Sequence, residues 1–69
     1  MPRLKSSKEI ISVLEYFGFE FVSQRGSHIK YIHKVKRKIV IIPANKKEIP
    51  HGTFSSILRQ SGISKNNFE

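Results

Sequence analysis

His28 lies in a short segment whose residue types suit acid–base chemistry on a phosphate. It directly follows Gly26-Ser27, with Arg25 before the glycine and Lys30 two residues further along the chain. An imidazole exchanges protons near neutral pH, so it can withdraw a proton from a hydroxyl or protonate a leaving oxygen. Neighbouring cations stabilise the charge that builds up on phosphorus oxygens in the transition state. This combination suits cleavage of an RNA phosphodiester bond beside a ribose 2′-hydroxyl.

The same pattern leaves other interpretations open. A histidine on a basic strand can also be a plain surface residue or a contact that stacks on a base. Acid–base cleavage usually employs two proton carriers, and the helpers available to His28 are Ser27 and His51. His51-Gly52-Thr53 precedes a predicted helix whose free N–H groups could hold a phosphate. Its alternative interpretation is a loop followed by an N-cap.

Metal-dependent chemistry is not expected from this sequence. The chain has no cysteine, and its imidazole ligands are limited to three histidines. His28 and His33 are five residues apart on one predicted strand, so they should face opposite sides and cannot share a zinc ion. The five acidic residues are scattered, which argues against a two-metal nuclease. We therefore expect a site that needs no metal ion or other cofactor.

Positive charge is concentrated in the middle of the chain. Thirteen Lys and Arg residues against five acids give a formal net charge of +8, and no acid occurs between Glu20 and Glu48. Such a block is an electrostatic footprint for a polyanion. We expect nucleic acid rather than a membrane, because the block coincides with strand patterning; a solvated basic surface is the alternative. The block contains Arg25, Lys30, Lys34, Lys36, Arg37, Lys38, Lys46 and Lys47.

Apolar spacing and capping signals predict the elements that position these residues. Ser6-x-x-Glu9 is a capping box that starts a helix. Thr53 is placed to cap a second helix, and Gly62 is placed to end it. Three segments rich in β-branched and aromatic residues predict strands. The expected elements are helices over residues 7–17 and 54–61, strands over residues 19–24, 28–33 and 38–42, and a short turn ending near residue 68.

The predicted order is α-β-β-β-α, an α+β fold in a single domain spanning residues 1–69. Short connections favour an antiparallel three-stranded sheet, with Gly26 supplying a positive φ in the first turn if one is required. Two helices can cover one face of this sheet and leave the other in water. If Ile29 and Tyr31 pack against the helices, His28 and Lys30 point to the open face. No leader or membrane span is evident, so we expect a cytoplasmic location.

Several of these segments together resemble the HicA toxin family, and the resemblance covers nearly the whole chain. One departure lies in the second hairpin, where many members resemble His-Pro-Asp-Gly-Arg and this chain has His33-Lys34-Val35-Lys36-Arg37. That departure concerns the turn geometry and leaves Gly26-Ser27-His28 intact. The segments that carry the resemblance are Phe19-Glu20-Phe21-Val22, Gly26-Ser27-His28, Tyr31, Pro43, His51-Gly52-Thr53 and Ile57-Leu58-Arg59-Gln60-Ser61-Gly62-Ile63-Ser64.

The resemblance implies a fold like that of the double-stranded-RNA-binding domain and endoribonuclease activity against messenger RNA, with His28 as the active-site histidine. In that family a HicB-type antitoxin covers the active face, and the pair represses its own operon through DNA contacts usually supplied by the antitoxin. The alternatives are a non-catalytic RNA-binding module that uses the same sheet face and a protein that docks an acidic partner. Residues expected to contact RNA are Arg25, Gly26, Ser27, Lys30, Lys36, Arg37, Lys38, Lys46 and Lys47.

Overall fold

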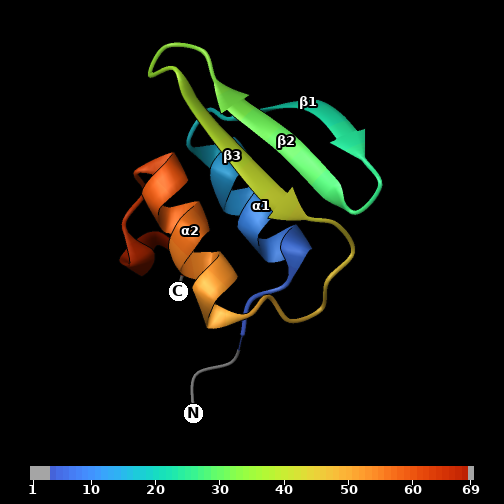
Figure 1. Ribbon diagram of the computed structural model, residues 1–69. Helices are drawn as coiled ribbons and strands as arrows, with labels where there is room; N and C mark the ends of the chain where they lie inside the picture. The colour runs from blue at the N-terminus through green and yellow to red at the C-terminus, as the bar shows by residue number, and fades with distance from the viewer. Residues whose placement is uncertain (1–3, 69) are drawn as a thin grey trace.

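A computed structural model describes residues 4–68 and shows the order α-β-β-β-α followed by a short 3-10 helix (Figure 1). The three strands form one antiparallel sheet in the order β1-β2-β3. The predicted fold class and element order are confirmed, and β2 has the predicted bounds. The elements are α1 (Ser7–Tyr16), β1 (Glu20–Arg25), β2 (His28–His33), β3 (Lys38–Pro43), α2 (His51–Ser61) and η1 (Lys65–Phe68).

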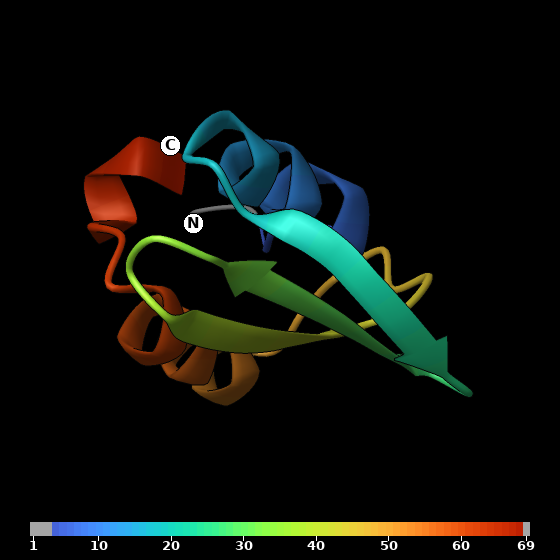
Figure 2. The same cartoon turned by 90° about the horizontal axis from the view of Figure 1, so that it is seen from above.

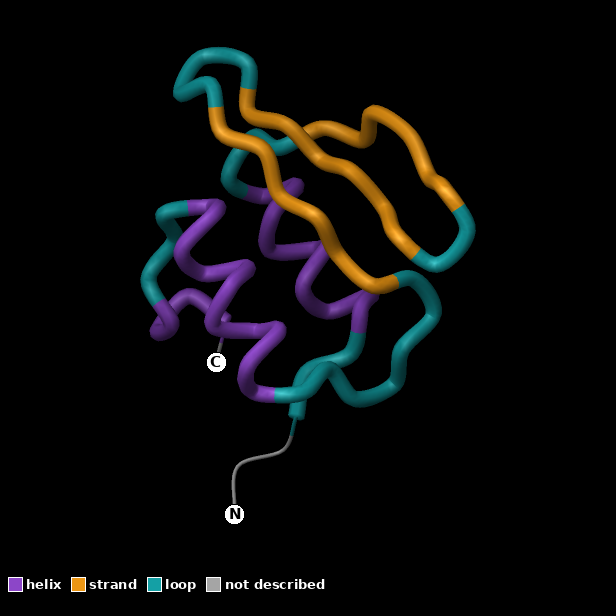
Figure 3. Tube along the Cα trace, viewed as in Figure 1, coloured by secondary structure: helices purple, strands orange, loops and turns teal. Residues whose placement is uncertain are grey.

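Both helices pack on one face of the sheet and leave the other face open (Figure 3). In β3, Val40 and Ile42 are fully buried, whereas Ile39 and Ile41 are 53% and 39% exposed. Seen from above, β1 and β3 form the two edges of the twisted sheet, and α2 lies beside β3 (Figure 2). The core between the layers is formed by Ile10, Leu14, Phe19, Tyr31, Val40, Ile42, Ile49, Phe54, Ile57, Ile63 and Phe68.

The predicted capping box starts α1. Ser6 Oγ accepts a hydrogen bond from the Glu9 N–H at 3.1 Å, and Glu9 Oε1 accepts one from the Ser6 N–H at 2.8 Å. Each side chain thus satisfies an N–H group that a helix start leaves without an intrahelical partner. After α1 the chain turns at Gly18, whose φ is +95°, and a Cβ there would lie 3.0 Å from His33 Nε2. Glycine fits this backbone conformation and this close approach.

The β1 strand contains a β-bulge at Val22. Phe21 lies opposite Tyr31, but Ser23 lies opposite Lys30, so the register shifts by one residue between them. Strict alternation would place Ser23 on the same face as Phe21. The extra residue instead moves Ser23 to the open face. The strand over residues 19–24 therefore does not alternate strictly beyond Phe21, and it begins and ends one residue later than predicted.

The α2 helix begins earlier than predicted, and the assignment of Thr53 as its N-cap is wrong. Pro50 occupies the N-cap position, and the Phe54 N–H donates to the Pro50 carbonyl at 2.9 Å. Proline fits here because its φ is fixed and a helix start has no intrahelical acceptor for its missing N–H. Gly62 ends the helix as predicted, with a φ of +72°. No helix formed by residues 4–68 combines the length and apolarity needed to cross a membrane.

Candidate active site

Residues from all three strands line one cavity on the open face of the sheet. The strand register explains how they meet, because Ser23, Lys30 and Ile41 form one row across β1, β2 and β3. Arg25 and His28 pair in the row nearer the β1–β2 turn. The cavity has a volume of about 370 Å³. We refer to it as the His28 cavity, and its lining residues are Ser23, Arg25, His28, Lys30 and Ile41.

The turn that precedes His28 is braced on both sides. Gly26 and Ser27 join Arg25 to His28 as a two-residue hairpin loop, and Gly26 has the positive φ that the sequence allowed for, +55°. Gln24 Nε2 donates to the Gly26 carbonyl at 3.0 Å, and the Ala44 N–H donates to the Ser27 carbonyl at 2.7 Å. His28 itself is exposed to solvent. The backbone therefore holds the histidine in place while its ring stays accessible to a ligand.

Arg25 and Lys30 flank His28 on the same face. Arg25 is its cross-strand partner, and Lys30 is two residues further along β2. Tyr31 is 5% exposed and Ile29 packs against the core, so β2 alternates as the sequence predicted. Among the described residues, no acidic side chain lines the cavity. The arrangement can attract a phosphate and place it beside an imidazole.

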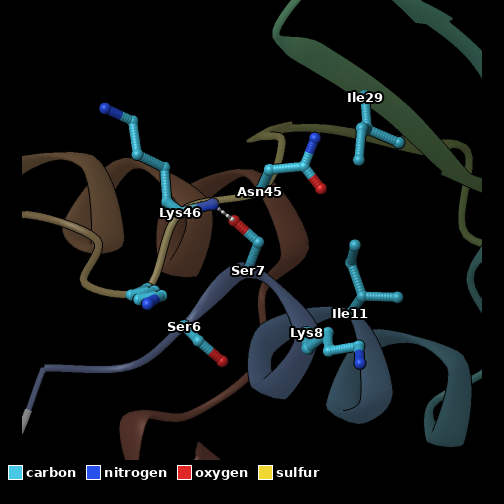
Figure 4. A pocket seen from close by; sticks show the side chains of 8 residues that line it. Ser6, Ser7, Lys8, Ile11, Ile29, Asn45 and Lys46 are labelled. Carbon is cyan, nitrogen blue, oxygen red and sulfur yellow. Dashed lines mark hydrogen bonds between the residues drawn. The ribbon is translucent and has the colours of Figure 1, made fainter.

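Lys46 and Lys47 lie at the same end of the sheet, in the loop between β3 and α2. The Lys46 N–H donates to Ser7 Oγ at 3.0 Å (Figure 4). The same hydroxyl donates to the Pro43 carbonyl, and together the two bonds fix the loop against α1. Both lysine side chains are exposed. They line a separate hollow of about 370 Å³ at the start of α1, together with Ser6, Ser7, Lys8, Ile11, Ile29 and Asn45.

The other predicted RNA contacts lie at the opposite end of the sheet. Lys36 and Arg37 belong to the β2–β3 turn, which follows His33 at the end of β2. His33 is five residues from His28, about 17 Å along the strand, so this turn is distant from the His28 cavity. Lys38 is turned to the helix side, because a Cβ on Gly62 would lie 3.2 Å from Lys38 Nζ. The Lys38 ammonium therefore lies at the C-terminus of α2, where the helix dipole favours a cation. The fold thus divides the basic block between two ends of the sheet.

The remaining candidates lie outside the His28 cavity. His33 faces the helix side, where its ring contacts Phe19 edge to face at a centroid distance of 5.2 Å. His33 Nδ1 also accepts a hydrogen bond from the Lys36 N–H at 3.1 Å. His51 is the first residue of α2 and, like Ser27, does not line the cavity. Within residues 4–68, no three His, Asp or Glu side chains form a group that could hold a metal ion.

Tyr31 connects β2 to α1 behind the cavity. Its hydroxyl donates to Glu15 Oε2 at 3.0 Å. Burial raises the pKa of the Tyr31 hydroxyl, and the hydrogen bond to the Glu15 carboxylate and the charge of that carboxylate raise it further. The neutral phenol is thus the form that the fold favours. Tyr31 supports the strand that carries His28 and Lys30 from the opposite face.

Two lining residues, Ser23 and Ile41, were not predicted from the sequence. Strict alternation would place Ser23 on the same face as Phe21, and the bulge at Val22 was not predicted from the sequence. Ile41 belongs to the apolar run Ile39–Ile42, which by itself resembles a buried strand. The signal that could have found Ser23 is the β1–β2 pairing register set by the two-residue turn at Gly26-Ser27, and for Ile41 it is the alternation of side chains along β3.

The comparison with known families covers the site and most of the fold. A family model described as the HicA toxin of bacterial toxin–antitoxin systems matches residues 7–63 of the 69-residue chain. The match runs from the first residue of α1 to one residue beyond Gly62 and includes the whole His28 cavity. No curated protein sequence matches the chain.

Proposed function

Because the chain belongs to the HicA toxin family of bacterial toxin–antitoxin systems, we propose that it is an endoribonuclease that cleaves messenger RNA at the His28 cavity. The family is known for toxins that cleave RNA. The observation that supports this chain's activity is the placement of an exposed imidazole between two cations on an open sheet face. A polyanionic substrate can reach this face because the helices pack on the other one.

His28 is the proposed general acid or base. When a ribose 2′-hydroxyl attacks the adjacent phosphorus, the bond from phosphorus to the 5′-oxygen breaks. One proton leaves the hydroxyl, and another must reach the departing oxygen; a histidine can perform either transfer. Arg25 and Lys30 stabilise the negative charge on the non-bridging oxygens. The products of this step are a 2′,3′-cyclic phosphate and a 5′-hydroxyl, and the step requires no metal ion.

The proposed RNA path begins at the β1–β2 turn. Gly26 and Ser27 allow the backbone of the RNA to approach His28, and the hydroxyl of Ser27 can donate to a phosphate oxygen. Lys46 and Lys47 extend the positive surface around the same end of the sheet. Lys36 and Arg37 then contact only RNA that is long enough to reach the other end of the sheet, and Lys38, which is turned to the helix side, lies off this path.

The partner of this toxin is an antitoxin, as its family implies, and we propose that it is of the HicB type. A HicB-type antitoxin would inhibit the chain by covering the open face. In this proposal the toxin acts in the cytoplasm, where messenger RNA is available, and meets DNA only within the antitoxin complex.

A non-catalytic RNA-binding module is the second candidate function. It is favoured by one observation: His28 is the only imidazole in the cavity, and no carboxylate lines it among the described residues. The second proton transfer would then have to be carried out by water or by a side chain that exchanges protons less readily at neutral pH than an imidazole or a carboxylate does. In this alternative the basic sheet face binds RNA without cleaving it.

Expression in cells separates the two functions. The wild-type chain, His28→Ala and the control His51→Ala are induced at equal levels, and growth and intact transcript are followed together. We expect growth arrest and transcript loss with wild type and His51→Ala, and neither with His28→Ala. If all three variants are folded and none shortens transcripts, the nuclease proposal is wrong and the binding module is the better account.

A further inference from the structure

The His28 cavity is larger and less uniform than a phosphate site needs to be. Its volume of about 370 Å³ lies within the range of sites that bind small organic molecules. Arg25, His28 and Lys30 supply the groups that recognise a phosphate, whereas Ile41 is an aliphatic side chain with no hydrogen-bonding atom. The cavity therefore also contains Ile41 and Ser23, one on each side of Lys30, which the proposed chemistry does not use.

The position of Ile41 is fixed by a contact from the other layer of the fold. Its backbone N–H donates to Gln60 Oε1 of α2 at 2.9 Å. β3 is an edge strand, and because this N–H donates to Gln60 it is not open to pairing with another chain. The Ile41 side chain nevertheless remains 39% exposed on the open face. A partly exposed isoleucine is thus held in the same row as Lys30 and Ser23.

We propose that Ile41 and Ser23 form a subsite for one nucleobase next to the phosphate that His28 attends. This inference rests on the proposed function and names the substrate class of that site. In RNA, each phosphate is linked through a ribose to a base, and the base is the part that offers a flat apolar surface. Ile41 provides an apolar contact for the face of the base, and the Ser23 hydroxyl can donate to or accept from its edge.

This subsite selects unpaired RNA. A base in a duplex is stacked and paired, whereas a base in a single strand can turn out and lie on a protein surface. Isoleucine recognises apolar area rather than a donor and acceptor pattern, and a single hydroxyl can bond to any base. The chain should therefore bind single-stranded segments with only weak preference for base identity.

Nuclear magnetic resonance of the isoleucine methyl groups tests the subsite independently of cleavage. The probe is a uridylyl-uridine dinucleotide whose 5′ ribose carries a 2′-methoxy group, so it has one phosphate and cannot be cleaved. Two matched probes lack the base on the 5′ or the 3′ nucleoside. Ile39 is the control residue, because it lies on the same strand and face but does not line the cavity.

We expect the dinucleotide to shift the Ile41 methyl resonances and to leave those of Ile39 nearly unchanged. One of the two abasic probes should lose this effect, which identifies the nucleoside that the subsite holds. Ile41→Ala removes apolar area from the contact with the base and should weaken dinucleotide binding by roughly threefold to tenfold, whereas Ile39→Ala should not. Thermal melting of both variants checks that they remain folded.

The outcomes distinguish this inference from the proposed function. Equal shifts at Ile39 and Ile41, no shift at Ile41, or equal binding by all three probes would overturn the subsite, even if His28-dependent cleavage is observed. A base-dependent shift at Ile41 supports the subsite even if the wild-type chain fails to cleave RNA, and in that case only the nuclease proposal is lost.

Discussion

Both ends of the three-stranded sheet carry several basic residues, but the surroundings of these residues differ between the two ends. At the end with the β1–β2 turn, which we call the near end, Arg25 and Lys30 share a cavity with His28. At the far end, with the β2–β3 turn, Lys34 pairs with Glu20 at 3.6 Å and Lys38 lies at the C-terminus of α2. A run of basic residues in the sequence therefore does not define one binding surface.

The largest difference between the two ends should appear in the rate of RNA cleavage. Lys30→Ala removes a cation from the His28 cavity, and we expect a loss of about 100-fold in kcat/KM, because the transition-state charge is then poorly stabilised. Lys36→Ala removes an equal charge at the far end and should cost less than about threefold. Purified variants are compared on one RNA at one salt concentration. Similar losses for the two variants would show that only overall charge matters.

A second difference should appear in the salt dependence of RNA binding. The double variant Lys46→Ala/Lys47→Ala loses two exposed cations at the near end. For single-stranded RNA, we expect the slope of log affinity against log salt to become shallower by about 1.4. On an RNA too short to reach the far end, the matched variant Lys34→Ala/Lys36→Ala should leave the slope almost unchanged. An equal change in the two slopes would contradict the assignment of the RNA path to the near end.

Substitution of one glycine at each end should distinguish effects on the stability of the fold from effects on RNA cleavage. Gly26 and Gly62 both have a positive φ, so substitution by alanine should lower the free energy of unfolding by about 1–2 kcal/mol in each case. Gly62→Ala should cost slightly more, because the flexible end of Lys38, 3.2 Å from the added Cβ, must move away from the C-terminus of α2, whereas the space around Gly26 is open.

Cleavage by the folded fraction gives the second readout for these variants. It should fall for Gly26→Ala, which disturbs the turn before His28, and stay unchanged for Gly62→Ala. Loss of cleavage in Gly62→Ala at a temperature where the protein is fully folded would show that the far end contributes to the site.

The smallest expected effect concerns Tyr31, which supports β2 from the helix side. Tyr31→Phe removes the hydrogen bond to Glu15 and should lower the free energy of unfolding by about 1 kcal/mol at neutral pH. The pKa of Tyr31 is raised in the folded protein, so the unfolded chain loses this proton first as the pH increases. The stabilisation is complete below the ordinary tyrosine pKa of about 10 and is lost as the pH rises through the higher folded-state value.

Denaturant unfolding at several pH values tests the direction of this pH dependence. The difference in the free energy of unfolding between wild type and Tyr31→Phe should become smaller above about pH 10. A difference that becomes larger with increasing pH would contradict this prediction.

Local signals in the sequence predicted the parts of the fold that depend on neighbouring residues. The capping box at Ser6 and Glu9 and the end of α2 at Gly62 are formed within one or two helical turns. The start of α2 was missed because Pro50 and Thr53 are both suitable first residues. A distant contact accompanies the earlier start, since the Ile49 N–H donates to the Lys5 carbonyl at 2.8 Å and Ile49 is buried.

The candidate site was predicted in part for the same reason. Alternation along β2 correctly placed His28 and Lys30 on the open face. Arg25 pairs with His28 and Phe21 pairs with Tyr31, and both pairings are possible only because β1 has one extra residue between them. The residue types along β1 do not indicate that Val22 is the residue that forms the bulge. Lys36 and Lys38 are far from His28 because β2 runs from His28 at one end of the sheet to His33 at the other. The number of basic residues in a segment gives no information about this separation.

The most direct test of the central claim is single-turnover cleavage of an unstructured RNA by the purified chain in the presence of a chelator. The account predicts that wild type and His51→Ala cleave at similar rates, and that His28→Ala cleaves at least about 100-fold more slowly while still binding the RNA. Cleavage by His28→Ala at the wild-type rate would contradict the account, because the reaction would then not depend on the imidazole at the near end.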